Sequence, residues 1–179
     1  MKKIVNWIPA FTLLAALAFS SCTVKDDTGS NNGSSRFQVF LTDNPANFSK
    51  VNVHIRAVMV NLTDNATDGW ITLGTNGGIY DLLNYQNGKD TLLAQGTIPA
   101  QTVKQIRLVL GTDNTVDIAN LTYPLTIPPD ATAGLKIGLN KEIRMPVESV
   151  TIDFDAAASV HDEGNGFYTL RPVLSIRTK

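Results

Sequence analysis

Short apolar runs with a two-residue period, separated by turn-forming residues, dominate the chain from Arg36 onward. In the first, RFQVFLTDNP, Phe37, Val39 and Leu41 recur at every second position until Asp43-Asn44-Pro45 ends the run. Successive side chains of a strand point to opposite faces, so this period predicts strands with one buried face. None of the later runs has the length and period of a helix. They are VNVHIRAVMVNL, KQIRLVLG, PLTIP, GLKIGL, SVTIDFDA and FYTLRPVLSI.

The second run changes phase in its middle. Val51, Val53 and Ile55 share one strand face, but the apolar positions from Val58 onward fall in the opposite phase. One extra residue in a strand would return these positions to the same face. We therefore expect a β-bulge near Arg56-Ala57.

The end of the chain carries a hairpin signal. The last two runs are joined by His161–Gly166 (HDEGNG), whose Asn-Gly pair is typical of a tight two-residue turn. Pro172 lies inside the final run. Because proline cannot donate a hydrogen bond to a neighbouring strand, we expect an edge strand or a bulge there.

These runs predict a single all-β domain over residues 36–179, an antiparallel β-sandwich of seven or eight strands. The composition, 43% hydrophobic and 17% charged, is that of an ordinary globular domain. A domain of about 140 residues buries roughly two thirds of the surface of its unfolded chain, which is enough core without metals or disulfides. The only cysteine, Cys22, excludes an internal disulfide.

Residues 1–21 have the order of an export signal peptide. Lys2 and Lys3 precede the apolar run AFTLLAALAF, and small residues stand just before Cys22. The apolar run is too short for a permanent transmembrane helix. We therefore expect residues 1–21 to be removed during export.

The Ser20-Ser21-Cys22 end of this leader resembles the lipobox of bacterial lipoproteins. The resemblance implies a diacylglyceryl group on the Cys22 sulfur and cleavage after Ser21, so that acyl chains hold the mature protein at the membrane. The expected localisation is the cell envelope, as an outer-membrane lipoprotein. Lys25-Asp26-Asp27 resembles the acidic signal that sends Bacteroidetes lipoproteins to the cell surface, and it fits a solvated charge pair in a linker equally well.

Residues 22–35 contain the expected lipidated cysteine and a segment rich in Gly, Ser, Asn and Asp, which predicts a flexible tether. Loss of the leader leaves 13 basic against 16 acidic residues and no basic cluster. Nucleic acid is therefore not an expected partner, because phosphate binding needs a concentrated basic face.

No catalytic set stands out in the sequence. His54 lies on the polar phase of its run and His161 opens a turn, which favours surface positions for both, and no Gly-x-Ser-x-Gly elbow occurs. Asp153 and Asp155 share one strand face, and paired carboxylates are typical of glycosidases. The resemblance to the chitinase-type Asp-x-Asp-x-Glu strand fails at Ala157. A polar strand face, or carboxylates that cap turn amides, is the favoured interpretation.

No metal or cofactor is expected. The loop aspartates lack EF-hand spacing, and zinc ligands are missing. Trp70 is expected in the core. Thr91, in Asp90-Thr91-Leu92, resembles a Bacteroidetes O-glycosylation pattern, and whether it is modified stays open. Aromatic side chains can stack on sugars or anchor protein contacts, and the tyrosines available for this are Tyr80, Tyr85, Tyr123 and Tyr168.

Ordered short motifs lie between Phe37 and Ile176. They are Phe37-x-Val39-x-Leu41-Thr42-Asp43-x-Pro45, Gly69-Trp70, Tyr80-Asp81-Leu82-Leu83, Asn87-Gly88, Ile98-Pro99-Ala100, Gln105-Ile106-Arg107-Leu108, Gly134-Leu135-Lys136-Ile137, Asp153-Phe154-Asp155-Ala156 with Ser159-Val160, and Gly164-Asn165-Gly166-x-Tyr168-x-Leu170-x-Pro172-Val173. Together these motifs resemble the domain of unknown function 4382 family of bacterial and archaeal lipoproteins. The resemblance implies a prealbumin- or transthyretin-like β-sandwich and brings no established activity.

With a lipid anchor, a tether and no catalytic set, we expect a non-catalytic binding or adhesion module for a glycan or protein ligand. The alternative is a structural or assembly subunit of a surface appendage, because exposed sheet edges can accept a donor strand. Arg36, just before the first strand, would then permit proteolytic maturation. A hydrolase that uses Asp153 and Asp155 is the third hypothesis.

Overall fold

The computed structural model describes residues 33–65 and 67–177, and the expected leader and Cys22 lie outside these described residues. The described part is all-β, with two sheets and three helices of four residues each. The strands are β1 (Ser34–Thr42), β2 (Lys50–Asn61), β3 (Trp70–Thr72), β4 (Gly74–Thr75), β5 (Gly78–Asp81), β6 (Thr91–Pro99), β7 (Thr102–Leu110), β8 (Thr115–Ile118), β9 (Leu121–Thr126), β10 (Leu135–Glu142), β11 (Val147–Phe154), β12 (Val160–Gly164), β13 (Phe167–Leu170) and β14 (Leu174–Arg177). The helices are η1 (Leu82–Tyr85), α1 (Pro129–Thr132) and α2 (Ala156–Ser159).

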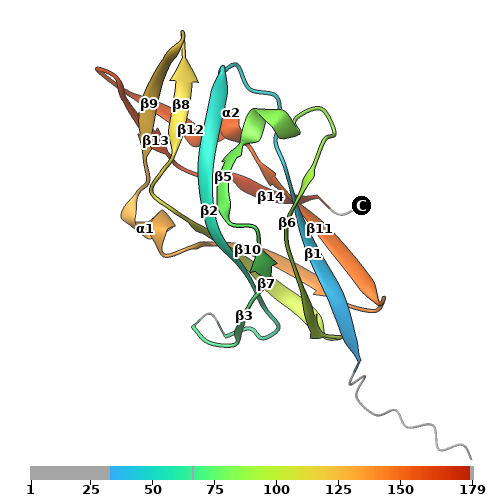
Figure 1. Ribbon diagram of the computed structural model, residues 1–179. Helices are drawn as coiled ribbons and strands as arrows, with labels where there is room; N and C mark the ends of the chain where they lie inside the picture. The colour runs from blue at the N-terminus through green and yellow to red at the C-terminus, as the bar shows by residue number, and fades with distance from the viewer. Residues whose placement is uncertain (1–32, 66, 178–179) are drawn as a thin grey trace, which may run out of the picture. The chain divides into compact units, whose positions relative to one another are not determined.

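The smaller sheet has five strands in the order β14-β11-β1-β6-β4 (Figure 1). Its central strand, β1, pairs in parallel with β11, from Arg36 opposite Val147 to Thr42 opposite Asp153. On its other side β1 pairs with β6 in the antiparallel sense. The strand begins at Ser34, so the last two residues of the expected tether belong to the sheet.

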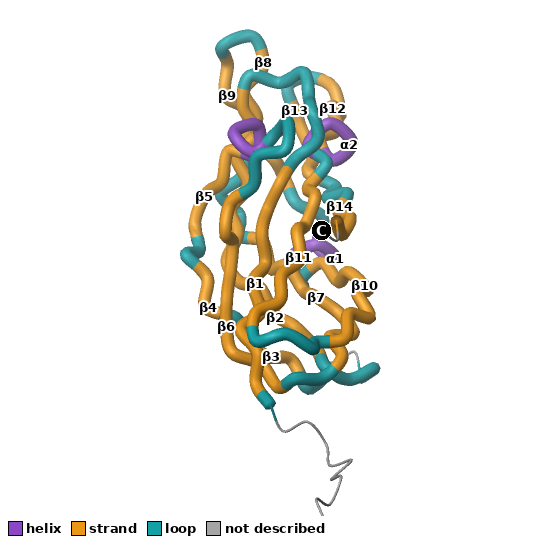
Figure 2. Tube along the Cα trace, turned by 90° about the vertical axis from the view of Figure 1, so that its right-hand side faces the viewer, coloured by secondary structure: helices purple, strands orange, loops and turns teal. Residues whose placement is uncertain are grey.

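The larger sheet has nine strands and is built around the long strand β2. One side of β2 pairs with β7 and β8, and the other side pairs with β5 and β3. Beyond β8 the sheet continues through β9 and β13 to β12. The hairpins β8–β9 and β12–β13 lie at the end of the fold opposite the start of β1, as Figure 1 and Figure 2 both show.

One buried apolar cluster joins the two sheets, as expected for a sandwich. Phe37, Val39 and Leu41 of β1 are fully buried in it, together with the apolar face of β2. The alternation in the first run is therefore confirmed as the core-facing side of a strand. Each of these side chains contributes about 1.5–3 kcal/mol through removal of apolar surface from water.

The predicted bulge in β2 is confirmed. The pairing of β2 with β7 shifts register between Ile55 and Ala57. Because of this shift, Ile55 before the irregularity and Val58 after it both reach the core with no exposed surface. The change of phase in the sequence thus corresponds to a change in backbone register and leaves a single buried face.

The predicted terminal hairpin is also confirmed. β12 and β13 are antiparallel neighbours. Asn165 and Gly166 form the turn between them, with φ angles of 55° and 80° that suit a two-residue hairpin. Pro172 lies in the short connection between β13 and β14, and β14 is an edge strand of the smaller sheet.

Two expectations about the sheets are wrong. The sheets are mixed rather than antiparallel, because β1–β11 and β9–β13 are parallel pairs, and the described residues form 14 strands rather than seven or eight. Alternation fixes which face of a strand is buried but carries no information on the direction of its neighbour. The count differs because the last apolar run is divided into two strands, β13 and β14, and because six strands lie outside the apolar runs: β3, β4, β5, β6, β8 and β12.

The expectation of a core position for Trp70 is wrong as well. Trp70 is half-buried at the start of β3, whereas Leu73, just after that strand, is only 2% exposed. The guanidinium carbon of Arg107 lies 3.9 Å from the centroid of the Trp70 ring. The indole is therefore covered by a cation–π contact rather than by the apolar core.

Candidate functional site

Asp153 and Asp155 lie at the end of β11, where the structure connects them to two distant segments. Asp153 is 4% exposed, and its Oδ2 accepts hydrogen bonds from Nη2 (2.7 Å) and Nε (3.0 Å) of Arg177 in β14. Its Oδ1 is buried and has no hydrogen-bond partner among the described residues. Arg177 also donates to Asn44, in the loop after β1. Asp153 therefore joins β11 to the neighbouring edge strand through an ion pair.

Asp155 forms hydrogen bonds with a helix end and a loop rather than an ion pair. Its Oδ1 accepts a hydrogen bond from the backbone N–H of Ala158 (2.9 Å), which makes it the N-cap of α2. Its Oδ2 accepts from the side-chain amide of Asn44 (3.3 Å). For Asp155 the interpretation of a carboxylate that caps turn amides is confirmed.

Asp43, which the sequence reading placed only in a turn, completes this group. It is 2% exposed, and its two oxygens accept hydrogen bonds from the backbone N–H of Ala156 (2.9 Å) and from Nε2 of Gln86 (2.8 Å). Burial raises the pKa of Asp43, and the nearby carboxylates of Asp153 and Asp155 act in the same direction although the two hydrogen bonds oppose them. Asp43 thus ties the end of β1 to α2 and to the loop after η1.

The group of Asp43, Asp153 and Asp155 is suited to holding loops together. Asp43 and Asp155 each accept two hydrogen bonds within the protein, and Asp153 is neutralised by Arg177. The histidines lie elsewhere: His54 Nδ1 is 3.3 Å from Asp113 Oδ2, and His161 is in β12. In the described part of the chain, no group of three or more His, Cys, Asp and Glu side chains is placed to hold a metal ion.

The raised pKa of Asp43 predicts a pH-dependent stability difference. In the wild type, the neutral carboxyl favours folding below its unfolded value near 3.8, and this contribution is lost as the pH rises through the higher folded value. Asp43→Asn has no such titration. Its unfolding free energy relative to wild type should therefore increase between pH 3.5 and pH 7, as measured by urea denaturation at each pH.

Glu142→Gln is the matched control for this titration. The hydrogen bond from Arg144 lowers the pKa of Glu142, so the wild-type contribution is present at neutral pH and lost on acidification. The unfolding free energy of Glu142→Gln relative to wild type should therefore not increase between pH 3.5 and pH 7. A flat or falling difference for Asp43→Asn would contradict the assignment.

The second candidate site is the pair of hairpins β8–β9 and β12–β13, which the parallel pairing of β9 with β13 holds side by side. Leu121, just after the first turn, is 59% exposed, and Phe167, just after the second, is 72% exposed. Tyr123 and Tyr168, on the same two strands β9 and β13, have ring centroids 4.9 Å apart. Partial desolvation, and then the adjacent Asp162 carboxylate, raise the pKa of Tyr168, so its phenol remains neutral at physiological pH.

The sequence reading included the two tyrosines but missed Leu121 and Phe167. A signal for Phe167 does exist, because an aromatic residue directly follows a predicted Asn-Gly turn. An apolar residue next to a turn is normally expected to be buried in the core, however. The sequence does not reveal that the two hairpins carry Leu121 and Phe167 beyond the core. Thr91 is half-buried at the start of β6, where it pairs with Leu41 of β1.

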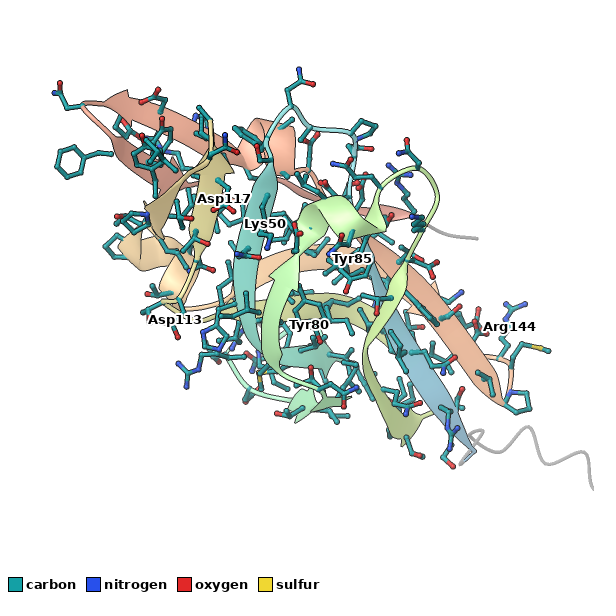
Figure 3. The ribbon with its side chains drawn as sticks, turned by 45° about the horizontal axis from the view of Figure 1, so that its top comes forward. Lys50, Tyr80, Tyr85, Asp113, Asp117 and Arg144 are labelled. Carbon is teal, nitrogen blue, oxygen red and sulfur yellow. The ribbon has the colours of Figure 1, made fainter. Side chains whose placement is uncertain are left out.

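Two cavities lie apart from the aspartates. One, of about 400 Å³, is lined by the start of β1, the β6–β7 turn and the β10–β11 loop with Arg144. Figure 3 shows Arg144 at the end of the molecule far from Asp117 of β8. The other, of about 300 Å³, lies along β9 and α1, close to the second candidate site.

Comparison with known proteins gives one match. A family model described as a domain of unknown function (DUF4382) matches residues 34–172, a range that includes the three aspartates and both hairpins but ends before Arg177. No curated protein and no solved structure matches the chain.

Proposed function

We propose that this chain, which belongs to the domain of unknown function DUF4382 family, is an envelope-anchored, non-catalytic binding or adhesion module. The observation that carries the proposal is the exposed apolar tip of two adjacent hairpins, at the far end of the fold from the start of β1 (Figure 1). Exposed aromatic and apolar side chains on a rigid scaffold are the usual anchors of binding surfaces.

The lipid anchor in this proposal is supported by the sequence alone. The leader of residues 1–21 followed by Cys22 supports a lipoprotein of the outer membrane, and Lys25-Asp26-Asp27 supports exposure at the cell surface. No helix within residues 33–65 or 67–177 has the length and hydropathy to cross a bilayer. The flexible tether predicted from the sequence would hold the domain near the membrane without fixing its orientation.

The anchor is tested by fractionating cells that produce the full chain. Mass spectrometry of the membrane-bound product should find an acylated Cys22 as its first residue. Cys22→Ser should move the protein from the membrane fraction to the soluble fraction. An unmodified cysteine, or a protein that keeps residues 1–21, would overturn the anchor.

Binding is tested with arrays of glycans and of cell-surface proteins, probed with the purified full-length protein in detergent. We expect at least one saturable ligand, bound about tenfold more weakly by a Leu121→Ser/Phe167→Ser double variant. Ile79→Ser is the control, since Ile79 is 58% exposed but lies on β5. The absence of any ligand, or equal loss in the control, would contradict the proposal.

One observation favours the second candidate, a structural or assembly subunit. Among the described residues, β14 pairs with only Thr151–Phe154 of β11, so the segment from Val147 to Val150 has a strand on one side only. Such an edge can accept a donor strand. Arg36 is not before the first strand but within β1, paired with Val147 and Thr97, so proteolysis there would need local opening. Concentration-dependent polymers in light scattering would favour this candidate over the binding module.

Two finer points complete the proposal. A transthyretin-like arrangement is supported by the two sheets around one core, and an experimental structure would test it. No hydrolytic role is proposed for Asp153 and Asp155, because Asp153 forms the ion pair with Arg177 and Asp155 caps α2.

A further inference from the structure

The small sheet of β9, β13 and β12 has two different faces. Tyr168 and Leu170 point toward the core, so Phe167 and Thr169 point to the opposite side by strand alternation. His161 of β12 lies opposite Thr169 and shares this side. We call this side of the small sheet the outer face, and its most exposed member is Phe167, at 72%.

An ion pair lies on the same face. Nη2 of Arg171, the residue after β13, is 2.9 Å from Oε1 of Glu163 in β12, and both side chains are about half-exposed. The pair neutralises itself and still presents N–H donors and carboxylate acceptors to solvent. Because its two charges cancel, the Arg171–Glu163 pair adds no net charge to the outer face.

The 300 Å³ cavity is lined in part by β9, the strand next to β13. Its lining includes Pro124 and Thr126 of β9. Thr126 is aligned with Thr169, so Pro124 is aligned with Phe167 on the next strand. The remaining lining residues add hydroxyl groups and apolar surface, and they are Thr112, Leu125, Ile127 and Thr132.

We infer that the outer face, from Phe167 to the cavity beside β9, binds a neutral oligosaccharide. A sugar ring needs an apolar platform for its C–H face together with donors and acceptors for its hydroxyls, and Phe167, the Arg171–Glu163 pair and the threonines supply these groups. Because the charges of the pair cancel, it offers no excess charge that would attract an acidic or a basic ligand. The inference rests on the proposed binding function and names its ligand class.

The faces distinguish a glycan from a protein ligand. Leu121 has the same phase in β9 as Tyr123 and Leu125, so it lies on the side opposite Phe167. A glycan on the outer face would not need Leu121. A protein that surrounds the hairpin tip would contact both Leu121 and Phe167.

The test is calorimetric titration of the purified full-length protein with neutral gluco-, xylo-, manno- and galacto-oligosaccharides and with acidic oligogalacturonates. Binding of at least one neutral series is expected. Phe167→Ala should weaken it about tenfold, Phe167→Trp should retain it, and Ile79→Ala, on β5, should leave it unchanged. Phe167, Ile79 and Leu121 are mostly exposed, so variants at these positions should fold, which circular dichroism checks.

Other results would overturn the inference in distinguishable ways. Binding of the acidic series alone, or neutral binding insensitive to Phe167→Ala, would remove the outer face as a neutral-glycan site. If no sugar binds but a protein-array ligand is lost in both Leu121→Ser and Phe167→Ala, the glycan class is wrong and the binding module stands. If neither class binds, both the inference and the proposed function fail.

Discussion

Arg177→Ala is expected to lower the free energy of unfolding by about 3 kcal/mol. The side chain of Asp153 is 5% exposed, and within residues 33–65 and 67–177 Arg177 is its only charged partner, at 2.7 Å. Removing the guanidinium leaves a buried carboxylate whose other oxygen already lacks a hydrogen bond. Because Arg177 is half-exposed and water can partly replace it, the loss should lie at the lower end of the range for broken buried pairs. Urea denaturation at pH 7 measures it.

Arg144→Ala is the matched control for Arg177→Ala. Its ion pair with Glu142 is as short, at 2.6 Å, but both side chains are exposed, so no measurable change is expected. Adding Asp153→Asn to Arg177→Ala should recover part of the loss, since a neutral amide costs less to bury. Equal losses in the two arginine variants would show that burial of Asp153 does not decide the effect.

The sequence predicted the strand faces well, because burial follows alternation directly. The bulge in β2 is the clearest case: Ile55 and Val58 can both reach the core only if the backbone gains a residue between them. The Asn165-Gly166 turn was equally predictable from the sequence, since both positions adopt positive φ angles that these two residues tolerate. In each case the signal lies within a few residues of the feature it predicts.

Structural features that depend on contacts between segments far apart in the chain could not be predicted from local sequence patterns. Nothing around Arg36 or Val147 indicates that β1 and β11 are parallel neighbours. The same limit applies to Asp43: the sequence places it in a turn, and only the fold brings it to Ala156 and α2.

The candidate binding surface could not be predicted from the sequence for another reason. Alternation assigns Phe167 to one side of β13, but whether that side is covered depends on where the other sheet ends. Leu121 is subject to the same uncertainty on the opposite side. Apolar residues near turns are therefore expected in the core when only the sequence is known, and the hairpins that extend beyond the core are recognised from the structure alone.

Gly111→Ala is expected to cost about 3 kcal/mol of stability, at the upper end of the usual range for overpacking. A Cβ on Gly111 would lie 2.2 Å from Nδ1 and 2.6 Å from Cγ of His54. The backbone cannot easily withdraw, because the Gly111 N–H donates to the His54 carbonyl at 2.7 Å and the Asn114 side chain donates to the Gly111 carbonyl at 2.8 Å. The imidazole must therefore leave its place over the β7–β8 loop, near Asp113.

A double variant tests whether the ring is the cause. Gly111→Ala/His54→Ala should be more stable than Gly111→Ala by about 2 kcal/mol, a non-additivity expected only for groups in contact. Gly138→Ala in β10 is the control and should be neutral or slightly stabilising, because a Cβ there meets nothing within 4 Å. If the double variant loses the sum of both single effects, the close approach of the His54 ring is not the reason why a side chain at position 111 is destabilising.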